Sequence, residues 1–413
     1  MKFSTLRYTL INITYFMAFC TVHAYAAVYL LDRGFTNTQI GLLLAVANIT
    51  SALAQPMVAS LIDRQGIFTN RNVMIICAGI IAAGSALLLV ADTNKILVFI
   101  VFALIYMIQF TYMPVMTALN FEYQNHGINI IYGLARGLGS AGFAITSALV
   151  GGIVEREGVR ILLYLNIVIM AVQIIIVYFF KLPKDAKTGD FASANITEDG
   201  KTGDVARSDE SANDKNSEEE ASSLTAFLGK YPAFVLMLAG TVLIFFTHNM
   251  LNDYLIQIVR PLGGSEKHLG YATFIAAFLE LPTMAAMTFF SKKLSMRVML
   301  VISGIAFTVK ALIMTLATNI PMVYISQSMQ LLAYAVFIPA SAYYVSQNIS
   351  EADQVKGQAF VTSCFTLSGV FSSLLCGVIL DHMGVKAMLV IGLIVSVAGA
   401  ALLTRAMLST KRA

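Results

Sequence analysis

The sequence predicts an all-α membrane protein whose twelve transmembrane helices form two pseudo-symmetric six-helix bundles. Of its 413 residues, 58% are hydrophobic and 12% are charged, whereas about a quarter of the residues of a soluble domain are charged. Twelve apolar runs each approach the ~20 residues that cross a bilayer. Six of them precede a long polar break and six follow it, and short sequence patterns recur between the halves.

The apolar runs are taken in chain order. In the first half they cover residues 8–31, 38–60, 73–91, 95–118, 130–152 and 159–181. In the second half they cover residues 232–256, 268–290, 297–317, 321–346, 357–380 and 386–405. The first run is too long for the apolar part of a signal peptide and ends in no small-residue cleavage site, so we interpret it as the first span.

The polar break between the halves predicts a linker. Residues 183–223 are rich in Asp, Glu, Ser, Thr, Gly, Asn and Lys, and they include three consecutive glutamates, Glu218–Glu220. Such a segment buries too little apolar surface to fold. We therefore expect an N-terminal bundle in residues 1–182, a disordered acidic cytoplasmic linker in 183–230 and a C-terminal bundle in 231–413.

Basic residues predict the orientation in the membrane. In a twelve-span arrangement, the side that holds both termini and the linker carries more Lys and Arg than the other side, for example at Arg71, Lys292 and Lys293. Cytoplasmic loops have this excess. Both termini are therefore expected in the cytoplasm. We also expect the protein to lie in the cell membrane and to be a monomer.

The two halves repeat each other. Residues 151–160 read GGIVEREGVR and residues 377–386 read GVILDHMGVK, while RNVMIICAGI at 71–80 is similar to RVMLVISGI at 297–305. Equivalent spans thus lie about half a chain apart and point the same way. Parallel six-span repeats about an axis along the membrane normal are typical of the major facilitator fold.

Arg136 is the first candidate site residue. It lies inside an apolar run and is surrounded by small residues, including Gly133, Gly137, Gly139 and Ser140. A guanidinium stays charged and costs roughly 2.5–3.5 kcal/mol at membrane depth, so it should face a cavity or a partner. Small residues let helices approach closely. The alternative is a structural arginine paired with a carboxylate.

Other polar residues inside the spans are candidates for substrate binding or proton coupling. The expected substrate-binding residues, beside Arg136, are Tyr25, Ser140, Glu122, Asn249, Lys310 and Gln330. The expected proton-coupling residues are Glu280, Lys310, His248 and Asp253. Each also has a structural interpretation, because intramembrane Asn and Gln commonly join helices and a histidine can be a hydrogen-bonded core residue. From their depths in antiparallel spans, Glu280 and Lys310 are expected to pair directly. Glu280 would then be the protonatable carboxylate, or the pair would be static.

Several classes of function are excluded. The sequence contains no GxSxG, HExxH, CxxC or Walker A pattern, so we expect neither an enzyme nor a nucleotide-driven pump. The four cysteines lie in apolar runs at spacings that fit no metal site, and no basic stripe suggests nucleic acid. No cofactor is expected.

The motifs also resemble a known family. Ala24-Tyr25, Gln55-Pro56, Asp63-Arg64-x-Gly66 and Tyr132-Gly133-x-Ala135-Arg136 are similar to motifs of the major facilitator superfamily. Within it they resemble the oligosaccharide:proton symporter family, which includes the lactose permease and phenylpropionate permease-like members. The resemblance implies sugar-hydroxyl binding by Arg136, a conformational role for Asp63, Arg64 and Gly66, and an equivalence of Lys310 to a family arginine.

The chain departs from that family at two proton-handling positions, where Gln330 and Ala333 replace a histidine and a glutamate. Glu122 lies about a turn from the family's sugar-binding glutamate, and Glu280 lies about a turn from another family glutamate. We expect a secondary transporter that couples uptake of a sugar or another small polar organic solute to protons. Aromatic acid or nucleoside uptake, drug export and a membrane sensor without transport are the alternatives.

Overall fold

The computed structural model describes residues 3–63, 68–181 and 224–409, and the regular structure in them is helical. The first bundle holds the elements before residue 182. They are α1 (Phe3–Phe19), the π-helical turn η1 (Cys20–Ala24), α2 (Ala26–Asp32), α3 (Asn37–Asp63), α4 (Asn70–Val90), α5 (Lys95–Asn125), α6 (Tyr132–Glu157) and α7 (Ile161–Phe179).

The second bundle holds the remaining elements. They are α8 (Leu224–Lys230), α9 (Pro232–Asp253), α10 (Leu255–Val259), η2 (Arg260–Leu262), α11 (Glu266–Lys293), α12 (Met296–Thr315), α13 (Ile320–Ser328), η3 (Met329–Leu331), α14 (Tyr334–Asn348), η4 (Glu351–Asp353) and α15 (Gln354–Ser409).

The expected twelve spans agree with these helices. Among the described residues, 10 helices are long and apolar enough to cross a membrane, and a bent pair formed by residues 3–24 and 26–32 makes up to 11. With 56 residues, α15 would extend for about 84 Å, far more than the ~30 Å hydrocarbon core. Its backbone turns at Gly384, so α15 crosses twice and completes the twelve.

Two glycines agree with the internal repeat. Gly158 follows α6 with φ 83° and ψ 171°, and Gly384 turns α15 with φ 80° and ψ 178°. Positive φ of this kind is readily available only to glycine. The two glycines occupy the same place in the repeated motif, so the same backbone turn ends the equivalent span in each half.

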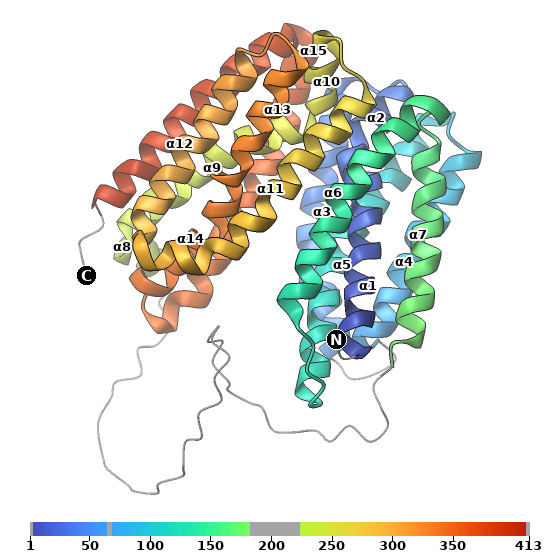
Figure 1. The fold of residues 1–413 in the computed structure, drawn as a ribbon, viewed down its shortest axis with the longest axis horizontal. Helices are drawn as coiled ribbons and strands as arrows, with labels where there is room; N and C mark the ends of the chain where they lie inside the picture. Colours follow the sequence, from blue (N-terminus) through green and yellow to red (C-terminus); the bar gives the residue numbers. More distant parts are fainter. Residues whose placement is uncertain (1–2, 64–67, 182–223, 410–413) are drawn as a thin grey trace, which may run out of the picture.

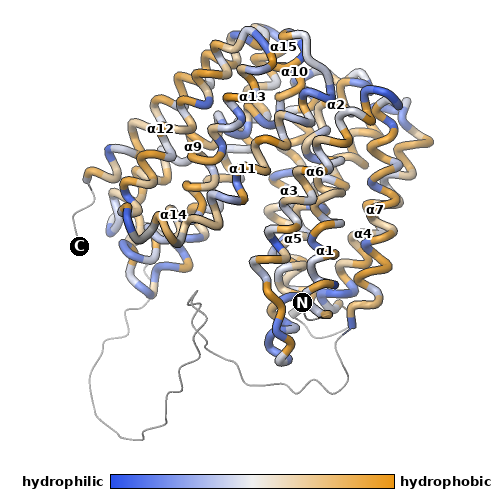
Figure 2. The backbone as a smooth tube through the Cα atoms, in the orientation of Figure 1, coloured by the Kyte–Doolittle hydropathy of each residue, from blue (hydrophilic) through white to orange (hydrophobic). Residues whose placement is uncertain are grey.

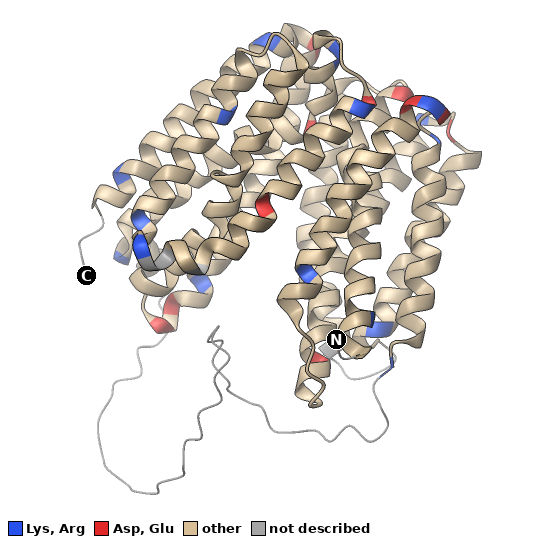
Figure 3. Cartoon of the chain, viewed as in Figure 1, with Lys and Arg blue, Asp and Glu red and all other residues tan. Residues whose placement is uncertain are grey.

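The bundles stand side by side and approach each other at one end (Figure 1). At the other end, where α1 begins and α15 ends, they are apart. Hydrophobic residues cover most of the helices, and hydrophilic residues gather at their ends (Figure 2). Lys, Arg, Asp and Glu follow the same distribution, with few of them along the middle of the helices (Figure 3).

The linker differs from expectation in its described part. Residues 224–230 form α8, and Phe227 is fully buried, stacked on Phe360 with ring centroids 5.3 Å apart. An aromatic residue supplies apolar area that the polar residues before it lack, so the expected disorder does not reach residue 230. Residues 183–223 of the expected linker, and Arg64 and Gly66 of the loop motif, lie outside the described residues.

Candidate functional site

Four glycines bring the bundles together at their closed end. A Cβ atom on Gly41 of α3 would lie 2.0 Å from the Ser373 carbonyl oxygen of α15, and one on Gly377 would lie 2.4 Å from that of Asn37. Between α6 and α11, a Cβ on Gly270 would lie 2.3 Å from the Ser147 oxygen, and Gly151 packs beside it. Only glycine allows such close backbone contact.

A tyrosine supports each of these contacts. The Tyr25 hydroxyl donates to the Ser147 carbonyl at 2.7 Å, and it lies beside Gly151 and Gly270. In the second half, the Tyr254 hydroxyl donates to the Ser373 carbonyl at 2.5 Å, beside Gly41 and Gly377. Tyr25 was expected to bind substrate, but its hydroxyl is engaged in the bundle interface.

Asp381 adds a polar contact on one side of the closed end. Its carboxylate accepts hydrogen bonds from the Asn37 amide N–H at 3.1 Å, the Asn37 side chain at 2.8 Å and the Thr38 amide N–H at 2.7 Å. Asn37 and Thr38 begin α3 in the other bundle. Asp381 of α15 therefore caps a helix N-terminus across the bundle interface, where an anion is favoured.

Arg136 lies on the first-bundle side of the space between the bundles. Its guanidinium donates to the Ser140 hydroxyl at 2.6 Å, one turn along α6, and lies 4.2 Å from the centroid of the Phe16 ring. Neither contact neutralises the charge. Glu280 and Tyr334 of the second bundle are within range of its electrostatic influence. Arg136 is thus a fixed positive charge that faces the other bundle.

The second bundle carries a hydrogen-bonded chain of three residues. The Lys310 ammonium donates to the Gln330 amide oxygen at 2.7 Å, and the Gln330 amide nitrogen donates to the Glu280 carboxylate at 2.8 Å. Lys310 is fully buried. The expected direct pair between Glu280 and Lys310 is therefore wrong, because the Gln330 side chain lies between them. This arrangement suits an ionised Glu280 and a charged Lys310, since each charged group meets the complementary end of the amide.

The other expected residues of the second bundle lie on α9. The His248 ring stacks on Tyr334 with centroids 5.3 Å apart, and its Nε2 contacts the Asn252 side chain at 3.0 Å. Asn249 donates to the Ser368 hydroxyl at 3.2 Å. The Asp253 carboxylate accepts from Ser373 at 3.1 Å, beside the closed end.

Glu122 is separate from this cluster. Its carboxylate accepts from the Asn70 side chain at 2.8 Å, at the start of α4. Asp63 ends α3. Sequence reasoning missed Phe16, Tyr334, Tyr254 and Asp381. The repeat offered a signal for Tyr254, because Tyr254 lies near the end of the first span of its half, as Tyr25 does in the other half.

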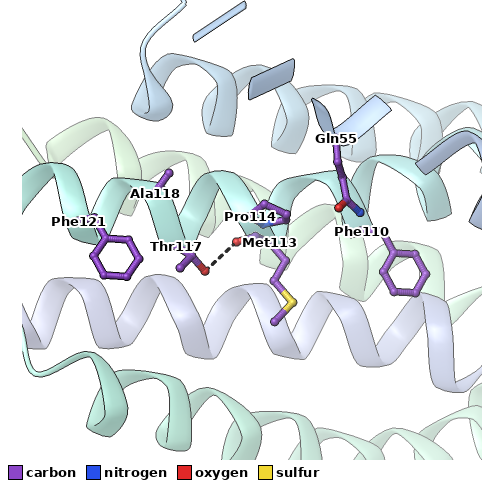
Figure 4. Close-up of a pocket in the computed structure, with 7 residues that line it drawn as sticks. All are labelled: Gln55, Phe110, Met113, Pro114, Thr117, Ala118 and Phe121. Atoms are coloured by element: carbon purple, nitrogen blue, oxygen red, sulfur yellow. Dashed lines mark hydrogen bonds between the residues drawn. The ribbon is translucent and has the colours of Figure 1, made fainter. Parts of the chain in front are cut away.

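A cavity of about 480 Å³ lies between α3 and α5 (Figure 4). Seven residues line it, namely Gln55, Phe110, Met113, Pro114, Thr117, Ala118 and Phe121. Ligand sites of this size are typically apolar with a few polar groups. Gln55 and Thr117 are the polar residues of this lining.

A cluster of charges outside the spans has a structural role. Asp92, between α4 and α5, accepts hydrogen bonds from Arg33 and Arg160, which belong to two other connections of the first bundle. The hydrogen bond from Arg160 lowers the pKa of the Asp92 carboxyl. The cluster joins three connections on the side remote from the termini and contributes no group to the space between the bundles.

Comparisons with known proteins agree with this architecture. The family model described as "MFS_1 like family" matches residues 6–390. A mutant of the nucleoside transporter NupG superposes with a TM-score of 0.77 and 13% identity, covering 99% of this chain and 100% of that one. A bacterial homolog of the human lysosomal transporter Spinster, in an inward-facing and unoccupied conformation, superposes with a TM-score of 0.65 and 14% identity. This match covers 98% of this chain and 96% of that one. No curated protein matches the sequence.

Proposed function

Because the chain belongs to the MFS_1 like family, we propose that it is a gradient-driven transporter that moves a small polar organic solute by alternating access. One observation carries this proposal: polar groups of both bundles face each other between the bundles, while glycine contacts join the bundles at one end. Rocking two bundles around a central site is how such repeats transport.

The orientation is part of the proposal. The positive-inside excess supports termini in the cytoplasm of a cell-membrane protein. The closed end then faces outward and the separated end faces inward. Solute would reach Arg136 from the cytoplasmic side in this state and from outside after the bundles rock. A monomer suffices, because both halves of the site come from one chain.

Arg136 is proposed to bind the solute. A guanidinium presents a planar fork that holds two oxygens at once, whereas an ammonium acts as a point charge. The neighbouring Ser140 hydroxyl holds one arm of the fork, and the Phe16 ring supports its face. The solute is therefore expected to carry oxygen atoms, as sugars, nucleosides and aromatic acids do.

Glu280 is proposed to carry the coupling proton. In the present arrangement the Gln330 amide stabilises its ionised form and links it to Lys310. Protonation would remove the negative charge that Gln330 and Lys310 now balance. The released Lys310 could then turn toward solute, which would make solute binding depend on the proton.

Reconstitution in proteoliposomes tests the proposal. The parent protein should exchange at least one labelled solute from a panel of sugars, nucleosides and aromatic acids, and Arg136→Lys should abolish exchange. Arg156→Lys is the matched control, because Arg156 is exposed at the far end of the same helix. Binding without exchange would instead indicate a sensor, and exchange by Arg136→Lys within twofold of the parent would refute the role of Arg136.

Glu280→Gln separates coupling from binding. If Glu280 carries the proton, the variant should still exchange solute but should fail to accumulate it across an imposed pH gradient. Undiminished accumulation at matched protein levels would exclude the coupling role.

A further inference from the structure

We propose that the cavity between α3 and α5 is a ring subsite of the transport site, and that the solute carries a planar aromatic ring with polar atoms on its edge. This inference rests on the proposed function and narrows its substrate class. The chemistry is shared by nucleosides and aromatic carboxylates, and it is absent from simple sugars.

The cavity lies on a face of α5 that is turned toward the second bundle. Tyr106 on α5 is buried and lies within electrostatic range of Asp253 on α9. Residues 110, 113, 117 and 121 follow Tyr106 at spacings of three or four, which is the period of one helix face. They change from part-buried to exposed as α5 runs away from the closed end. The cavity therefore opens toward the space between the bundles.

The lining suits a flat ring better than a polyol. Phe110 and Phe121 project from the same side of α5, with Met113 between them (Figure 4). Aromatic rings prefer stacked or edge-on contacts with one another, and methionine sulfur also favours aromatic partners. A sugar with hydroxyls on every carbon would leave several of them without partners on these apolar walls.

Gln55 supplies the polar recognition. Its side chain reaches from α3 toward α5 beside Phe110 (Figure 4). Among the described residues no hydrogen bond of its amide is found, so both its donor and its acceptor can serve a ligand. An amide pairs well with a ring edge that presents one acceptor and one donor. An acyl chain of a lipid would satisfy neither group.

Both ends of the cavity connect to the surroundings of Arg136. Phe110 contacts Phe19 at 5.6 Å between centroids, and Phe19 contacts Phe16, the ring under the Arg136 guanidinium. At the other end, Phe121 stacks on Tyr132 at 6.3 Å, one turn before Arg136 on α6. A ring bound in the cavity would therefore lie beside the aromatic residues that surround Arg136. Arg136 would bind the oxygen-bearing part of the solute.

The absence of tryptophan from the chain permits a direct test. Phe121→Trp places a single fluorescent reporter in the cavity, and Phe179→Trp places the same residue on α7, where Phe179 is 63% exposed. Uridine, phenylpropionate and methyl glucoside serve as probes for purified protein. We expect saturable quenching of the Phe121→Trp reporter by uridine or phenylpropionate, no effect of methyl glucoside, and no saturable response from Phe179→Trp.

Gln55→Leu in the Phe121→Trp background should weaken binding of the ring probe by about tenfold, because it removes both hydrogen bonds. Phe110→Trp repeats the measurement from the other end of the cavity if Phe121→Trp does not fold. The ring probe that responds shows whether the ring belongs to a nucleoside or to an aromatic carboxylate.

The outcomes separate the two proposals. No saturable response to either ring probe, or quenching of the reporter by brominated lipid chains alone, overturns the ring subsite. A response that Gln55→Leu leaves unchanged also overturns the assigned recognition. Exchange of methyl glucoside in proteoliposomes without ring binding would refute this inference and leave the transport function standing. Ring binding without exchange of any solute would support the ring subsite and refute the transport function.

Discussion

Replacing Asp381 by alanine is expected to weaken the closed end of the protein. The Asp381 carboxylate accepts three hydrogen bonds from the first two residues of α3, which belong to the other bundle. These contacts exist only while α3 and α15 are together. When the bundles separate at this end, the carboxylate returns to water and α3 loses its cap. The substitution therefore acts on one conformation and leaves the other almost unchanged.

The size of the effect follows from the value of a helix cap. Removing a capping side chain costs about 0.5–2 kcal/mol, and the charge at a helix N-terminus adds about 0.3–1 kcal/mol. Because Asp381 is exposed, solvent screening favours the lower part of this range. A loss of about 1–2 kcal/mol would reduce the ratio of closed to open protein at this end about 5–30-fold.

Distances between spin labels measure that ratio. Ile96 on α5 and Leu316 after α12 are exposed residues near the closed end of each bundle, and the four native cysteines are buried. Labels on Ile96→Cys and Leu316→Cys should show a larger share of long distances in Asp381→Ala than in the parent. Asp381→Asn, which keeps one acceptor oxygen, should give an intermediate share.

Glu155 provides the matched control, because it occupies the place of Asp381 in the repeated motif. Among the described residues, no hydrogen bond joins its carboxylate to the other bundle, so Glu155→Ala should leave the distances unchanged. An unchanged distribution in Asp381→Ala, or an equal shift in both variants, would refute the reasoning.

Three further predictions follow from the described contacts. Gly41→Ala should insert normally but lose most solute exchange, because its Cβ would lie 2.0 Å from a carbonyl oxygen; Gly79→Ala, with nothing within 4 Å, should exchange normally. Asp92→Asn should lower the melting temperature at pH 7. Since the Asp92 pKa is lowered on folding, this difference should persist above about pH 5 and shrink below about pH 4, as the parent carboxyl protonates. Lys310→Met should reduce solute accumulation, and a melting temperature that falls while accumulation per folded molecule stays constant would show that Lys310 is only structural.

The composition and the lengths of the apolar runs were enough to predict the fold class. A bilayer requires about 20 apolar residues for each helix, so the span count can be read from hydrophobicity alone. The repeated motif that contains Gly158 and Gly384 also predicted the parallel arrangement of the halves, because its two copies lie about half a chain apart. The structure adds that both glycines turn the backbone with positive φ. The helix at residues 224–230 was missed because it lies beside a long polar segment.

The site was predictable only at residues whose charge is energetically costly to place inside the membrane. Arg136, Glu280 and Lys310 are charged residues inside apolar runs, and such residues need a partner or a cavity wherever they occur. Glu122 and Tyr25 were assigned to substrate binding as polar residues of the spans, and in the structure their side chains contact Asn70 and Ser147. Depth along a span does not determine the direction in which a side chain points.

By itself, the sequence determined that this chain crosses a membrane twelve times in two related halves, because hydrophobic length and glycine-dependent turns are local properties. The tertiary structure alone decided that Gln330 lies between Glu280 and Lys310, that Asp381 caps α3, and that Gln55 meets the aromatic face of α5. Each of these contacts joins residues from different helices. Its geometry depends on how the helices rotate and pack, which the hydrophobic pattern of a single span leaves open.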